Sequence, residues 1–125
     1  MKTFAMIVFV GILTVLLFDT LGSLAAKALG FPYPLLMVGS VFIYALVGFA
    51  AGMRGGVALA LLAGALTGLA DSTLGWYISL RLGPAQPALE ATIPLILMTV
   101  IVVMGLAAVF GLLGGLIAKL VRVKA

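Results

Sequence analysis

The sequence predicts an all-α, polytopic membrane protein: a four-transmembrane-helix bundle made of two tandem helical-hairpin repeats in parallel orientation. Of its 125 residues, 66% are hydrophobic and only 8% are charged, and the mean hydropathy is +1.44. Because a soluble domain carries about 25% charged residues, this chain has too little polar surface to cover itself in water. Lipid must therefore surround most of its side chains, and each helix that crosses the lipid needs about 20 mostly apolar residues.

Long apolar intervals between charges place the four helices in order. We expect them at about 4–28, 35–53, 56–81 and 92–119, where the first and third continue past an aspartate. Glycine and proline mark the breaks: residues 30–34 form the first turn, Arg54-Gly55-Gly56 a very tight second turn, and residues 83–87 open a longer third connection. The length leaves no room for a separate soluble domain.

Self-similarity between the first and third helices predicts an internal duplication, with hairpins at 1–54 and 55–125. Gly11, Leu13, Thr14, Thr20, Leu21, Gly22, Leu29 and Gly30 recur fifty-three positions later as Gly64, Leu66, Thr67, Thr73, Leu74, Gly75, Leu82 and Gly83. Lys2 and Asp19 recur fifty-two positions later as Arg54 and Asp71, so the alignment slips by one residue near Asp71-Ser72. Two helices per copy give both copies the same membrane orientation, related by a pseudo-two-fold axis along the membrane normal.

Basic residues predict the orientation, because Lys and Arg are retained on the cytoplasmic side of short loops. One side of the membrane receives Lys2, Arg54, Lys119, Arg122 and Lys124, and the other receives Lys27 and Arg81 beside Glu90. We therefore expect a multi-pass protein of the cell membrane, in a bacterial inner membrane, with both termini cytoplasmic. Topology accounts for the net charge of +4, so no nucleic acid partner is expected. Aromatic side chains at the outer interface are Tyr33, Trp76 and Tyr77.

A cleaved signal peptide is the competing interpretation of the first helix. Lys2 precedes an apolar stretch, and Ser23-Leu24-Ala25 resembles a small-residue cleavage site. The match between the first and third helices argues against it, because a cleaved signal peptide would not be expected to share a sequence repeat with a transmembrane helix of the mature protein.

Asp19 and Asp71 are the only acidic residues within the predicted helices. A charged residue costs about 2.5–3.5 kcal/mol at the centre of a membrane helix, so an intramembrane carboxylate is first considered functional. If both face the pseudo-axis, they repel one another, and a shared proton or a bound cation would relieve the repulsion. Neutral oxygen ligands stand beside them in Thr20, Ser72 and Thr73.

The structural alternative is that the two aspartates only mark the outer ends of their helices. At about 1.5 Å per residue, each lies about 25 Å along its helix from the inner basic residue, in the outer third of a core about 30 Å thick. From there a carboxylate can turn toward headgroups or bond a neighbouring helix.

Small residues at helical spacing predict close helix packing, since backbones that approach closely gain the dispersion energy that replaces the hydrophobic effect in lipid. The glycines in these stripes are Gly48, Gly52, Gly64, Gly68, Gly111 and Gly115.

The residue inventory leaves two functional hypotheses. The chain has no cysteine and no histidine, which removes thiolate nucleophiles and the usual zinc sites, and no nucleophile has an activating partner. We expect no enzyme activity, no cofactor and no metal site.

The first hypothesis is an ion- or proton-linked channel or transporter that uses Asp19 and Asp71. The alternative is a non-transporting scaffold or accessory subunit whose glycine-rich faces bind a second copy or another membrane protein. Membrane lipids are partners in both cases.

Overall fold

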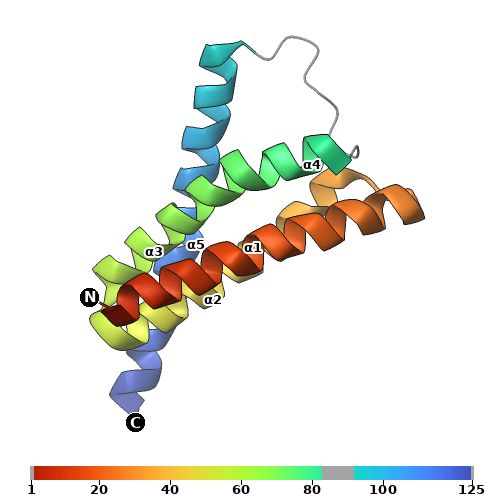
Figure 1. The fold of residues 1–125 in the computed structure, drawn as a ribbon. Helices are drawn as coiled ribbons and strands as arrows, with labels where there is room; N and C mark the ends of the chain where they lie inside the picture. Colours follow the sequence, from red (N-terminus) through yellow and green to blue (C-terminus); the bar gives the residue numbers. More distant parts are fainter. Residues whose placement is uncertain (1, 83–91, 125) are drawn as a thin grey trace.

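The computed structural model describes residues 2–82 and 92–124, and it confirms the predicted four helices (Figure 1). The first helix is α1, Lys2–Leu29, and a short 3-10 turn, η1, Tyr33–Leu35, leads into α2, Leu36–Gly55. The third helix consists of α3, Val57–Ala70, the π-helix η2, Asp71–Gly75, and α4, Trp76–Leu82. The fourth is α5, Ile93–Lys124. The predicted third connection and Glu90 lie outside the described residues.

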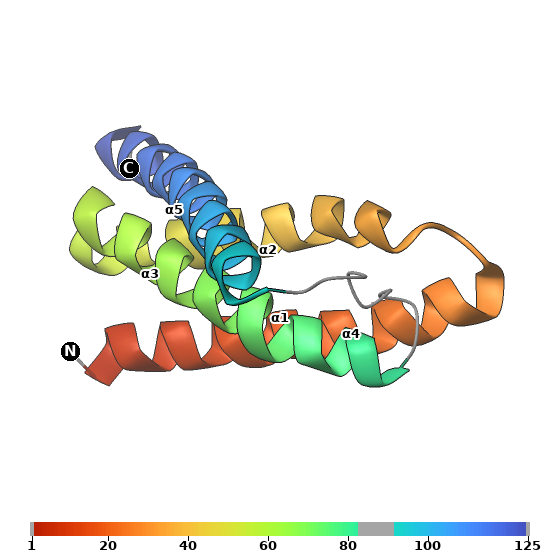
Figure 2. The ribbon, with the colours of Figure 1, turned by 90° about the horizontal axis from the view of Figure 1, so that it is seen from above.

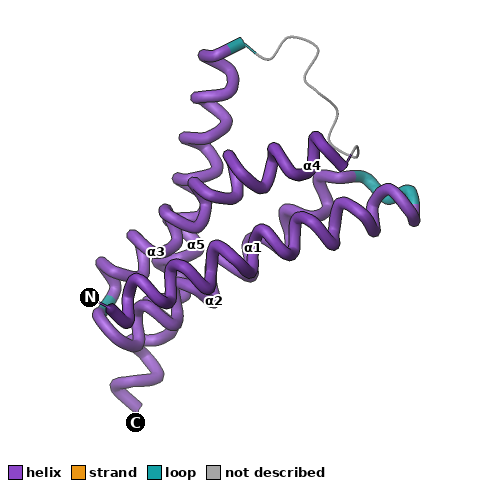
Figure 3. The backbone as a smooth tube through the Cα atoms, in the orientation of Figure 1, coloured by secondary structure: helices purple, strands orange, loops and turns teal. Residues whose placement is uncertain are grey.

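Each of the four helices is long and apolar enough to cross a membrane. The helix α1 and the continuous run from α3 to α4 point in the same direction, while α2 runs in the opposite direction (Figure 1). Both views place the N-terminus and the turn between α2 and α3 at the same end of the molecule (Figures 1 and 2). The smooth backbone trace in Figure 3 shows that the third helix continues through η2 without a break.

Glycine permits the tight connection between α2 and α3. Gly56 has φ +89°, a left-handed conformation that a residue with a Cβ adopts only with strain. Its N–H donates to the carbonyl oxygen of Gly52 at 3.1 Å, which ends α2. Because α3 begins at the next residue, the two helices are joined with almost no loop.

The second half of α5 packs directly on α2 and α3. Its buried residues are Ala107, Gly111, Gly114, Gly115 and Ala118. A Cβ built on Gly111 would lie 2.7 Å from the carbonyl oxygen of Ala60 and 2.9 Å from the Cα of Gly64, so only glycine fits. The first half of α5 diverges from the other helices (Figure 1).

The helix α1 packs on α2 and α3 through larger side chains. One buried cluster contains Val8, Val47, Ala51 and Ala63, and a second contains Val15, Tyr44 and Ala107. The second cluster joins α1, α2 and α5 beneath the level of Asp19.

A π-helix, η2, interrupts the third helix at Asp71–Gly75. A hydrogen bond from residue i+5 to residue i encloses one more residue than the i+4 bond of an α-helix, and such irregularities recur at functional sites. Asp71 matches Asp19 at a shift of fifty-two, whereas the predicted identities before and after it have a shift of fifty-three. The predicted alignment therefore has the same shift on both sides of Asp71.

The packing predicts that Gly111→Val destabilises the bundle, because the new side chain meets the backbone of α3. We expect a loss of at least about 1–3 kcal/mol, the cost of overpacking, measured as a lower melting temperature by circular dichroism in detergent. Gly105→Val is the matched control in the same helix, since a Cβ at Gly105 meets nothing within 4 Å. Equal melting temperatures for the two variants would contradict the packing described here.

Candidate functional site

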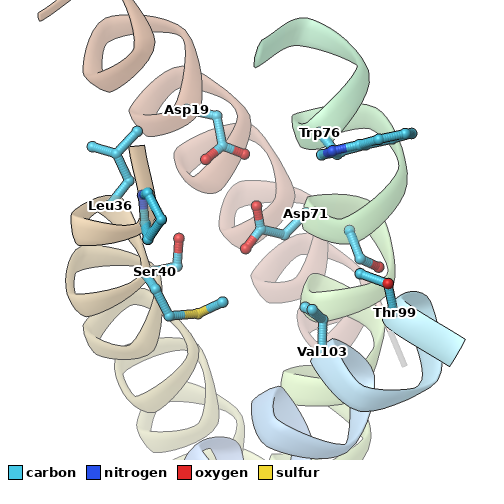
Figure 4. A pocket seen from close by; sticks show the side chains of 10 residues that line it. Asp19, Leu36, Ser40, Asp71, Trp76, Thr99 and Val103 are labelled. Atoms are coloured by element: carbon cyan, nitrogen blue, oxygen red, sulfur yellow. The ribbon is translucent and has the colours of Figure 1, made fainter. Parts of the chain in front are cut away.

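Asp19 and Asp71 meet between α1 and the π-helix. Asp19 is 2% exposed, and Asp71, the first residue of η2, is half-buried. Figure 4 shows their carboxyl groups pointing toward one another, and the two side chains lie within hydrogen-bonding reach. Among the described residues, the Oδ2 atom of Asp19 makes no hydrogen bond. The carboxyl groups therefore face one another inside the bundle.

Gly75 provides the space in which the carboxyl groups meet. A Cβ at this position would overlap the Oδ2 atom of Asp19 and would lie 2.9 Å from the Oδ1 atom of Asp71. Because Asp71 and Gly75 are the two ends of the π-helix, the same irregularity supplies one carboxyl group and makes room for the other.

Tyr44 on α2 holds Asp71 in place, and the sequence analysis missed it. Its side chain is fully buried, and its hydroxyl donates to the Oδ2 atom of Asp71. Ser40, one turn earlier and 3% exposed, lies within hydrogen-bonding reach of the same hydroxyl. The available signal was a tyrosine in the middle of an apolar span, where its hydroxyl needs a partner from the protein.

A cavity of about 170 Å³ opens beside the carboxyl pair. Four parts of the bundle line it (Figure 4): Asp19 from α1, Leu36 and Ser40 from α2, Asp71 and Trp76 from the third helix, and Thr99 and Val103 from α5. Within residues 2–82 and 92–124, no lysine or arginine lines this cavity. The carboxyl pair therefore has no cationic partner on the described walls of the cavity.

Of the three hydroxyl residues predicted as ligands, only one lines the cavity. Ser72 lines the cavity, although its Oγ atom donates to the carbonyl oxygen of Leu69 at 3.2 Å. The hydroxyls of Thr20 and Thr73 donate to carbonyl oxygens of their own helices, at 2.9 Å and 2.6 Å. The structure thus brings Asp19, Asp71 and Ser72 together at the cavity, whereas Thr20 and Thr73 are not among its lining residues.

The three aromatic residues predicted at the outer interface lie in different surroundings. Trp76 lines the cavity. Tyr77 is 54% exposed, and its hydroxyl accepts a hydrogen bond from the Nε atom of Arg81 at 3.0 Å, with the guanidinium 5.2 Å from the ring centroid. Tyr33 lies in η1, at the start of α2.

The site can hold a proton or a single positive charge. Two ionised carboxylates in contact repel strongly where water is excluded, so one proton shared between them, or one cation beside them, lowers their free energy. In the described part of the chain no group of three His, Cys, Asp or Glu side chains converges to hold a metal ion.

No family model matches the chain, and no curated protein or solved structure matches it either. The geometry of the site therefore carries the functional argument.

The Tyr44 contact predicts that Tyr44→Phe destabilises the protein. Removing the hydroxyl leaves the Oδ2 atom of the half-buried Asp71 without its donor, which costs about 1–3 kcal/mol. Tyr77→Phe is the control, because the exposed Tyr77 hydroxyl can be replaced by water and its loss costs at most about 0.5 kcal/mol. Chemical or thermal unfolding in detergent would measure both, and a Tyr44→Phe variant no less stable than Tyr77→Phe would refute the role given to the buried hydroxyl.

Proposed function

We propose that the protein is a small proton- or cation-linked membrane transporter in which Asp19 and Asp71 form one exchangeable site. The observation that carries this proposal is the meeting of the two carboxyl groups at an interior cavity with no basic side chain on its described walls. A carboxyl pair that only stabilised the fold would be expected to have a fixed cationic partner. A pair without one needs a proton or cation, which solvent can exchange.

The position of the site also supports the proposal. An aspartate that only marks a helix end would be expected to turn toward the headgroups. Asp19, in contrast, is only 2% exposed. Its neighbours are a second carboxyl group and a cavity. These are the surroundings of a residue whose charge changes during function.

We further propose that the two hairpins are copies of one ancestral unit. The eight identities between the first and third helices at a shift of fifty-three support this, together with the match of Asp19 with Asp71 at a shift of fifty-two. Duplicated hairpins in parallel orientation place their equivalent aspartates on either side of a pseudo-two-fold axis. A site formed at a repeat interface is a recurrent arrangement in transporters.

The proposed setting is a cell membrane, with both termini in the cytoplasm. Five basic residues lie at the end of the bundle that contains the N-terminus, the turn between α2 and α3, and the end of α5. This bias favours the inward orientation of that end. The cavity then lies nearer the outer surface than the inner one.

The scaffold hypothesis receives less support. It requires glycine-rich faces that are free to bind a partner. The glycines Gly48, Gly52, Gly64, Gly68, Gly111 and Gly115 instead contact other helices of the same chain, so the surface needed for assembly is already used within the bundle.

Flux in reconstituted vesicles tests the proposed transport. We expect wild-type protein in proteoliposomes with an imposed pH gradient to dissipate that gradient when at least one cation from a panel of Na⁺, K⁺, ammonium and small amines is added. Asp19→Asn and Asp71→Asn should each reduce the flux to that of empty vesicles, because neither variant retains the carboxyl pair that forms the exchangeable site.

Thr14→Val is the matched control, since the Thr14 hydroxyl is exposed on α1 and donates to the carbonyl oxygen of Val10 at 2.7 Å. This variant should transport like wild type. Full flux in both asparagine variants, or no flux with any cation of the panel, would refute the proposal.

A further inference from the structure

We infer that the cavity beside Asp19 and Asp71 binds a small organic monocation, an ammonium group on an apolar body about the size of one aromatic ring. The inference rests on the proposed function, because it names the class of cation that exchanges with the proton.

The polar end of the cavity needs a donor. The Oδ2 atom of Asp19 has no hydrogen bond among the described residues, although the side chain is almost fully buried and lines the cavity. A buried acceptor without a partner is unfavourable, and a charged N–H donor gives the strongest available hydrogen bond. An ammonium group at this end would lie beside the carboxyl groups of Asp19 and Asp71, both of which belong to lining residues of the cavity, and would neutralise the pair.

The volume of the cavity indicates a molecule and not a bare ion. The space is about 170 Å³, whereas one water molecule occupies about 30 Å³, and an engineered apolar cavity of about 150 Å³ binds benzene. A bare alkali ion would leave most of this volume to be filled by water.

The walls away from the carboxyl groups are mostly apolar, so a water molecule there makes few hydrogen bonds. The lining residues here include Pro34, Leu36, Met37, Trp76 and Val103, with Thr99 beside Val103 on α5. Filling this part with carbon removes apolar surface from water at about 25 cal/mol per Å², and an indole ring attracts a nearby cation. A hydrated inorganic ion gains neither contribution.

Charge balance favours a single positive charge. The titratable groups around Asp19 are Asp71 from η2 and Tyr44 from α2, while α5 contributes Thr99 and Val103 to the cavity. With one proton shared between the carboxyl groups, the pair carries one negative charge, which a monocation neutralises. Loss of the bound cation and uptake of one proton return the site to neutrality.

Trp76 makes the inference directly testable, because it is the single tryptophan of the chain and it lines the cavity. Benzylammonium, benzyl alcohol and Na⁺ would each be titrated onto the purified protein in nanodiscs while Trp76 emission is recorded. We expect a saturable change with benzylammonium alone. Asp19→Asn and Asp71→Asn should weaken its binding by about 10- to 100-fold, the loss expected for one charged hydrogen bond, and Thr14→Val should leave it unchanged.

A second variant keeps both carboxyl groups, in case the asparagine variants do not fold. Val103→Phe fills part of the apolar wall, so it should weaken benzylammonium binding by about tenfold or more while methylammonium still displaces protons from the protein. The inference would be overturned by equal responses to benzylammonium and benzyl alcohol, by a response to Na⁺ that matches the one to benzylammonium, or by no effect of Val103→Phe.

If wild-type vesicles carry Na⁺ or K⁺ against protons but Trp76 never responds to benzylammonium, the inference fails and the proposed function stands. If vesicles also show no flux with any cation, the proposed function fails too.

Discussion

The second half of α5 lies against the bare backbones of α2 and α3, and Gly48, Gly64 and Gly111 permit that contact. In lipid the hydrophobic effect contributes little to helix association, so close backbone approach and interhelical hydrogen bonds must hold the bundle together. The contact also fixes the direction of α5, whose first half leaves the other helices (Figure 1). The divergence lets Thr99 and Val103 form a wall of the cavity, where a parallel fourth helix would be expected to close the space.

The carboxyl pair depends on a second irregularity, the π-helix. Asp71 and Gly75 lie at its two ends, and Gly75 leaves room for the carboxyl group of Asp19. Tyr44 then connects α2 to the pair through its hydroxyl. Polar groups within a membrane must find partners inside the protein. Here three helices contribute to one polar cluster, in which the Oδ2 atom of Asp19 has no donor in the described part of the chain. An incompletely satisfied cluster is the physical basis for assigning a cation or a proton to this site.

Much of the fold followed from the sequence, because four long apolar runs separated by glycine, proline and charge admit few other solutions. Asp19 and Asp71 were also identified, since an acid within an apolar span stands out. The cavity could not be predicted: it depends on the direction of α5, which no local pattern encodes. Tyr44 was overlooked as one more apolar ring, and the hydroxyls of Thr20 and Thr73 use the carbonyls of their own helices, as threonines in membrane helices often do. The π-helix at Asp71–Gly75 was not predicted from the sequence.

The central claim is that Asp19 and Asp71 form one site and not two. A double-mutant cycle measures this directly: the free energy of unfolding of wild type, the two single asparagine variants and the double variant, in the same detergent. Groups in contact show coupling of about 0.5–3 kcal/mol, whereas independent positions add within about 0.3–0.5 kcal/mol. The account predicts coupling within the first range, because replacing either carboxyl group removes the repulsion and the shared proton at once. Additive effects of the two substitutions would contradict it.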